Sequence, residues 1–245
     1  MYDQHLRLAT NETLITQLAL EQVPISLWIC DPNWPYRQTG GGDPTKFRST
    51  AKREYSEGDY GIITQALARA ATVSTPDAVL CLYVTAPQKM DVARRVVTPL
   101  EDWGCWKYMA CVYWHKSPGA PGIGQWLRND VEELWILSRA GRLPPHLRGA
   151  LKPGSKAPCF RNWIEAAAIE PEQSPGRGKG IEHSEKPVAL ERSVISRFCP
   201  PGGIVGSLWS GTYPTGRACR ELGLTCHGAE PDADRHAMAK RKMEA

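Results

Sequence analysis

The chain has 245 residues, which is long enough to bury the core of one large α/β domain. Apolar residues make up 42% and charged residues 23% of the chain, as in an ordinary soluble globular protein, and the net charge is +4. No stretch of about 18 uninterrupted apolar residues is present, so a membrane-spanning helix is not expected. The charged start MYDQHLRLATNE does not resemble a secretory signal. We therefore expect a cytoplasmic protein.

Apolar patterning predicts helices and strands that alternate along the chain. In chain order we expect a helix over 11–22 capped by Asn11, a strand over 26–30, a helix over 59–71, a strand over 78–85, a helix over 88–103, strands over 107–116 and 132–140, a helix over 186–198, a strand over 203–209, a helix over 214–222, a strand over 225–230 and a helix over 232–243. This order predicts a mostly parallel sheet with helices on both faces. We expect one domain over 1–245, with residues 140–184 as a basic loop insertion.

The eight cysteines are scattered, and none of them is in CxxC spacing. A zinc site or a disulfide framework is therefore not expected. Several cysteines lie in apolar runs, among them Cys30, Cys81 and Cys111. We interpret them as reduced, buried thiols of a cytosolic protein.

The segment CDPNWPY at 30–36 follows a buried strand and carries two large aromatic residues around a second proline. A plain turn needs the Asp and Pro but not the aromatics. An exocyclic amine on a nucleobase becomes nucleophilic when both its N–H groups donate hydrogen bonds and its lone pair is freed from the ring. Asp31 and the Pro32 carbonyl can accept those bonds, while Trp34 or Tyr36 stacks a base that has left its helix. A strand-terminating Asp-Pro turn remains the alternative.

Basic residues gather in segments rich in Gly, Pro and Ser. Between Arg139 and Arg161 there are six basic and no acidic residues: Arg139, Arg142, Arg148, Lys152, Lys156 and Arg161. Smaller groups lie at 46–53 and 177–179. Each group alone is consistent with a solvated loop. Together they favour a polyanionic partner, and Arg142, Arg148 and Lys152 are candidate nucleic-acid contacts.

Several motifs resemble those of amino-methyltransferases that methylate adenine N6, especially the MT-A70 family. DPNW resembles the DPPW motif of that family, with Asn33 in place of the second proline. GIGQWLRNDVEELWILSRAG and EHSEKP resemble its GxGxWxRNxxExLLxxxRG and HSxKP stretches, in the same order. The resemblance implies a Rossmann-like methyltransferase fold, S-adenosylmethionine as the cofactor and no metal. It assigns Asp31, Pro32, Trp34 and Tyr36 to catalysis.

The same resemblance implies further site residues. Trp126, Arg128 and Asn129 match the family's loop on the substrate side, although Arg128 is also in position to pair with Glu132 or Glu133 across a turn. Lys186 of HSEKP matches the lysine near the carboxylate of the cofactor, and Asp31 is expected to border the cofactor as well.

The end of the chain resembles the cofactor half of permuted DNA amino-methyltransferases, PGGxVxDPFxGSGTT followed by GxExDxxxxxAxxR. Glu230 in GAEPDADRHAMAKR is placed to bind ribose hydroxyls; the alternative is a helix-start acid favoured by the helix dipole. SLWSGTYPT replaces the glycine-rich loop, so the expected cofactor contacts there are Ser207, Trp209 and Gly211. Tyr213 and Pro214 are expected to add bulk where the backbone should approach the cofactor.

These features predict transfer of a methyl group from S-adenosylmethionine to adenine N6 in DNA. The alternative is an impaired or inactive homologue that binds nucleic acid. Cytosine N4 and RNA adenine also remain open as acceptors, because the same hydrogen-bond logic serves them.

Overall fold

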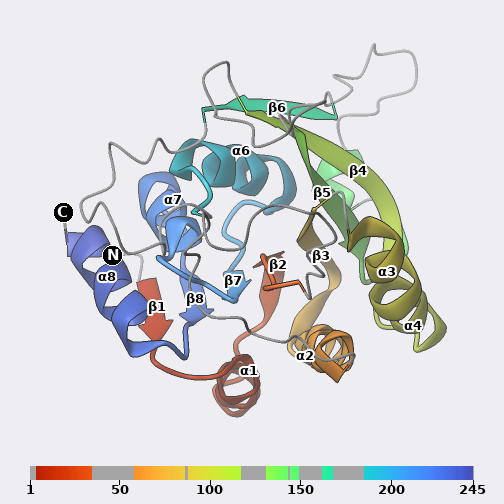
Figure 1. The fold of residues 1–245 in the computed structure, drawn as a ribbon, viewed down its shortest axis with the longest axis horizontal. Helices are drawn as coiled ribbons and strands as arrows, with labels where there is room; N and C mark the ends of the chain where they lie inside the picture. The colour runs from red at the N-terminus through yellow and green to blue at the C-terminus, as the bar shows by residue number, and fades with distance from the viewer. Residues whose placement is uncertain are drawn as a thin grey trace, which may run out of the picture.

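The computed structural model describes residues 4–34, 58–85, 88–116, 131–142, 144–148, 162–167 and 185–244. Its centre is an eight-stranded sheet in the order β1-β8-β7-β2-β3-β5-β4-β6 (Figure 1). The strands are β1 (Gln4–Arg7), β2 (Ile25–Cys30), β3 (Ser74–Val84), β4 (Lys107–Lys116), β5 (Val131–Ser138), β6 (Trp163–Ala166), β7 (Val205–Leu208) and β8 (Cys226–Ala229). Among these described strands, only β5 runs antiparallel to its neighbours, so the expected mostly parallel sheet is confirmed.

Helices cover both faces of this sheet. They are α1 (Asn11–Leu20), α2 (Gly58–Thr72), α3 (Lys89–Val92), the π-helix η2 (Ala93–Val97), α4 (Thr98–Asp102), α5 (Pro145–Arg148), α6 (Val188–Phe198), α7 (Pro214–Leu222) and α8 (Ala233–Glu244). In Figure 1, α1 and α2 lie on one face and α6 and α7 on the other. Each face of the sheet has its own hydrophobic core, and alternate residues of the central strands point into one core or the other. Trp28 packs with α1 and α2, and Ile29 packs with α6 and α7.

Strand β1 was not expected from the sequence. QHLR carries little apolar signal, and β1 lies at the edge of the sheet, where its pairing with β8 depends on backbone hydrogen bonds. The cap of the first helix also differs. Thr10 is the N-cap, and its Oγ1 accepts a hydrogen bond from the Thr13 N–H at 3.2 Å. Asn11 is the first helical residue, which leaves its side chain available to the loop after β7.

Seven of the eight cysteines lie in the described residues, and all seven are free thiols. Five of them are buried: Cys30, Cys81, Cys199, Cys219 and Cys226. Within the part of the chain that the structure describes, the expectation of reduced, buried thiols is confirmed for Cys30 and Cys81, whereas Cys111 is partly exposed. Among those same residues, no helix combines the length and the apolar character that crossing a membrane requires.

Candidate functional site

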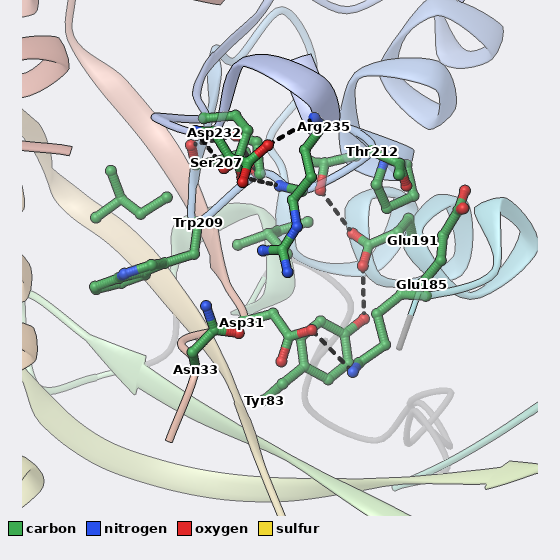
Figure 2. A pocket seen from close by; sticks show the side chains of 18 of the residues that line it. Asp31, Asn33, Tyr83, Glu185, Glu191, Ser207, Trp209, Thr212, Asp232 and Arg235 are labelled. Carbon is green, nitrogen blue, oxygen red and sulfur yellow. Dashed lines mark hydrogen bonds and ion pairs between the residues drawn. The ribbon is translucent and has the colours of Figure 1, made fainter. Parts of the chain in front are cut away.

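A cavity of about 390 Å³ opens at the carboxyl ends of β2, β7 and β8 (Figure 2). This volume is within the range of small-molecule sites. The end of β2, the loop after β7, the end of β8 and the first turns of α6 and α7 all contribute to its walls. Asp31 and Glu230, expected at strand ends, both line it. Parallel strands therefore bring residues from the two ends of the chain to one site.

Asp31 belongs to a network of alternating charges. Lys186 Nζ lies 2.9 Å from Asp31 Oδ2 and 3.3 Å from Glu132 Oε2, and Glu132 Oε1 lies 2.5 Å from Lys116 Nζ. Glu132 lies near the carboxyl ends of the parallel strands because β5 runs antiparallel to them, so that the beginning of β5 lies beside the end of β3. The side chain of Asp31 is 34% exposed, against 10% for Lys186. Asp31 is thus held by a buried lysine and still presented to the cavity.

The pKa values of these groups follow from burial and pairing. Burial raises the pKa of Asp31, and the Lys186 ammonium opposes that rise without cancelling it. Burial alone would lower the pKa of Lys186, but the carboxylates of Asp31 and Glu132 raise it above its ordinary value. Burial would raise the pKa of Glu132, but Lys186 and Lys116 together lower it. Lys186 therefore stays cationic between two acids.

Trp34 and Pro32 turn away from the cavity. Trp34 is 8% exposed, its Nε1 donates to the Tyr83 carbonyl oxygen at 2.8 Å, and its ring stacks on Tyr60 at 6.2 Å between centroids. Pro32 is buried, and neither residue lines the cavity, whereas Asn33 does. Asn33, which replaces the second proline of the DPPW pattern, was not among the expected site residues. The alternation along the extended chain after β2 explains why Asn33 takes the place expected for the tryptophan.

The loop after β7 brings the expected cofactor residues together. Ser207, Trp209 and Gly211 all line the cavity, as does Glu230. Gly211 has φ +54°, and its N–H donates to Glu230 Oε2 at 2.9 Å. Trp209 also has a positive φ, +56°, and its N–H donates to Asn11 Oδ1 at 3.1 Å. A bulky residue in the left-handed region is strained, so Asn11 helps to hold the loop in this shape.

The expectation that Tyr213 crowds this loop is wrong. Its side chain is fully buried in the core beneath α6 and α7, and Tyr213 is not among the residues that line the cavity. Gly216 and Gly228 make room for the ring, because a Cβ atom on either of them would overlap its carbon atoms. Pro214 does line the cavity, as the first residue of α7, where its missing N–H costs no helical hydrogen bond.

Glu191, in the first turn of α6, is a cavity residue that sequence reasoning missed. It is 1% exposed and accepts hydrogen bonds from the Tyr83 hydroxyl at 2.8 Å and from Thr215 Oγ1 at 3.2 Å. Its position has a signal in the sequence, because Val194 and Ile195, three and four residues later, place Glu191 on an apolar face of the helix. A carboxylate within such an apolar stripe is unusual and indicates a specific partner.

The remaining expected residues are placed only in part. Arg142 is exposed, with its Nη2 atom 3.7 Å from Asp77 Oδ1, and Arg148 is the last residue of α5. Five expected site residues lie outside the described residues: Tyr36, Trp126, Arg128, Asn129 and Lys152.

Comparison with solved structures identifies the fold. The chain superposes on the M1.HpyAVI–SAM complex with a TM-score of 0.68 at 17% identity, covering 99% of this chain and 100% of that one. The PvuII DNA methyltransferase, described as cytosine-N4-specific, gives 0.65 at 15% identity, covering 98% and 86%. A putative DNA modification methylase from Thermus thermophilus, complexed with S-adenosyl-L-methionine, gives 0.57 at 15% identity, covering 99% and 93%. No protein-family model and no curated protein matches the sequence. The fold is therefore that of a Rossmann-like methyltransferase.

Proposed function

We propose that this chain is an S-adenosylmethionine-dependent DNA methyltransferase that methylates an exocyclic base amine, with adenine N6 as the acceptor. The observation that carries the proposal is one cavity holding both Asp31, at the end of β2, and Glu230, at the end of β8. Asp31 is suited to accept a hydrogen bond from the base amine, and Glu230 is suited to accept hydrogen bonds from the ribose hydroxyls of the cofactor. The solved structures of similar fold support the proposal, since they include a DNA methyltransferase and an S-adenosyl-L-methionine complex of a putative DNA modification methylase.

The lining of the cavity fits this cofactor. S-adenosylmethionine has a net positive charge, and the carboxylates of the lining outnumber its cations: Asp31, Glu185, Glu191, Glu230 and Asp232 against Lys186 and Arg235. Each Glu230 oxygen accepts one backbone N–H, from Gly211 or Asp232, and keeps a lone pair for a ribose hydroxyl. Lys186 is the candidate partner of the methionine carboxylate. The bound cofactor supplies an electrophilic methyl group on a sulfonium.

Asp31 binds and activates the base amine in this proposal. Its carboxylate accepts an N–H group of the amine, and this weakens the delocalisation of the nitrogen lone pair into the ring. Asp31 also stabilises the positive charge that develops on the nitrogen, while Lys186 and Glu132 fix its orientation. The base reaches this depth only after it has left its stack. Asn33 faces the same space and is a further candidate contact for the base.

Cytosine N4 is the second candidate acceptor. The similarity to a structure described as cytosine-N4-specific favours it, and the hydrogen-bond demands of the two amines are the same. The decisive experiment is titration calorimetry with S-adenosylmethionine, followed by incubation with unmethylated DNA and mass spectrometry of the nucleosides. Detection of N6-methyladenine would support adenine N6 as the acceptor, and detection of N4-methylcytosine would show that the acceptor is cytosine N4 instead. An RNA substrate serves as a parallel arm. DNA binding without cofactor binding would establish the inactive homologue instead.

The basic segment gives a separate prediction on DNA binding. Replacing Arg142, Arg148, Lys152 and Lys156 together with Gln should weaken binding, because each lost phosphate contact lowers the log–log salt slope by about 0.9 on duplex DNA. Cofactor affinity should be unchanged. Lys240 and Arg241, exposed on α8, provide the control pair, whose replacement by Gln should leave the slope as it is. If the salt dependence of DNA binding is the same in the fourfold variant as in the unaltered protein, these residues do not contact DNA and the segment is a solvated loop.

A further inference from the structure

Two buried carboxylates that line the cavity, Glu191 and Glu230, form no ion pair within the described residues. Glu191 is 1% exposed and accepts hydrogen bonds from two hydroxyl groups, those of Tyr83 and Thr215. Figure 2 shows the hydrogen bond between Glu191 and Tyr83. Other acids of this region have different partners: Asp31 pairs with Lys186, Glu185 pairs with Arg217 and Lys242, and each oxygen of Glu230 accepts a backbone N–H. Within the residues that the structure describes, Glu191 forms no ion pair.

The surroundings of Glu191 leave a negative balance. The titratable, charged and hydroxyl groups that face it come from β2, β3, α7 and the segment before α6: Cys30, Asp31, Cys81, Tyr83, Thr215, Cys219 and Lys186. Lys186 is the single cation among them, and it already serves Asp31 and Glu132. Burial raises the pKa of Glu191 to about 7. The hydrogen bond from the Tyr83 hydroxyl opposes this rise, and the charge of Asp31 adds to it. A cationic group placed in the cavity would supply the missing counter-charge.

We propose that Glu191 binds the α-ammonium group of the methionine part of the cofactor. This inference rests on the proposed function. The Tyr83 and Thr215 hydroxyls each occupy one carboxylate oxygen, and each oxygen keeps a lone pair that can accept an N–H. An ammonium donates such bonds, and a sulfonium has no N–H to donate. Lys186, just before α6, lines the same cavity as Glu191. The cavity therefore offers an ammonium for the carboxylate of the methionine part and a carboxylate for its α-ammonium.

The inference predicts a pH dependence of cofactor affinity. The ammonium binds the ionised carboxylate, so binding lowers the pKa of Glu191 and releases a proton when the free group was protonated. Affinity should therefore rise with pH up to about 7, by at most tenfold per pH unit, and level off above it. Calorimetry in buffers of different ionisation enthalpy measures the released proton directly. These measurements use the unaltered protein.

Glu191→Gln separates this group from the other acids. We expect its affinity for S-adenosylmethionine and for S-adenosylhomocysteine to fall about ten- to a hundredfold at pH 8, because both ligands carry the ammonium. Affinity for 5′-methylthioadenosine, which lacks the amino-acid end, should change by less than about threefold, well under one charge-assisted hydrogen bond. The pH dependence and the proton release should disappear. Glu221→Gln, a half-exposed carboxylate on α7, is the matched control and should behave as the unaltered protein does.

Four results would overturn the inference. The first is a flat pH profile without proton release in a protein that binds the cofactor, and the second is unchanged affinity in Glu191→Gln. The third is an equal loss of affinity for 5′-methylthioadenosine, which would make Glu191 a structural residue. The fourth is a loss of affinity confined to S-adenosylmethionine, which would make the sulfonium the group that Glu191 binds. Glu191→Asp keeps the charge and, if Glu191→Gln fails to fold, must retain the pH dependence. Absence of binding of all three ligands to the unaltered protein would overturn the proposed function as well, which distinguishes the two failures.

Discussion

Replacing Asp31 with alanine is expected to lower the rate of methyl transfer at least about a hundredfold, in the range seen when one group that stabilises developing charge is removed. The melting temperature should stay within a few degrees of the unaltered protein. Asp31 is at a strand end with 34% of its side chain exposed, and Lys186 keeps Glu132 as a partner at 3.3 Å. The measurement is transfer of labelled methyl groups to DNA, with thermal unfolding in parallel.

Two further variants sharpen this result. Asp31→Asn keeps one acceptor oxygen and removes the charge, so it should retain more activity than Asp31→Ala if hydrogen bonding contributes beside electrostatics. Glu12→Ala removes a carboxylate of α1 that is 71% exposed and paired with Arg69, and it should change neither quantity. A parallel loss of melting temperature and activity in Asp31→Ala would make Asp31 a structural residue.

Replacing Tyr213 with alanine is expected to destabilise the protein by about 3–5 kcal/mol, the usual cost of removing a large buried aromatic side chain. The ring is fully buried against Gly216 and Gly228, and neither glycine has a side chain that could fill the space left behind. For a chain of this size the melting temperature should fall by roughly 6–20 °C. Denaturant titration measures the free energy of unfolding directly.

The backbone at Tyr213 allows a finer test. Its φ of +61° is strained for any residue with a side chain, at about 1 kcal/mol or more. Tyr213→Gly relieves that strain and should be about 1 kcal/mol more stable than Tyr213→Ala. Tyr213→Phe keeps the ring and should stay close to the natural protein. A Tyr213→Gly variant that gains cofactor affinity without losing stability would restore the sequence-based expectation that this side chain blocks the loop.

The architecture was predictable because its signals are local and strong. The buried strands β2 and β3 contain apolar runs, at 27–30 and 78–84, and the alternation of such strands with helices specifies a mostly parallel sheet. The carboxyl ends of such strands lie at one edge, so Asp31 and Glu230 could be assigned to one site from their positions alone.

What the sequence could not supply was the direction of individual side chains. Trp34 and Tyr213 both look like pocket residues in a motif, and both pack into the core instead. Their directions depend on partners distant in the chain, namely the Tyr83 carbonyl for Trp34 and Gly228 for Tyr213. Glu191 was missed for the converse reason, since a glutamate near a helix start is ordinarily exposed.

The hydrogen bond between Asn11 and Trp209 has a consequence for how the molecule assembles during synthesis. The loop that lines the cavity is anchored to a helix made 198 residues earlier, and β1 finds its only described strand partner in β8. Contacts of such long range form slowly and late. During synthesis on the ribosome, β2 can pair with β3 before β7 and β8 have been made. Until then, β1 lacks its partner β8, and one edge of β2 lacks its partner β7. Until β7 emerges, the growing chain therefore exposes the apolar edge of β2, and an unpaired apolar strand edge promotes aggregation.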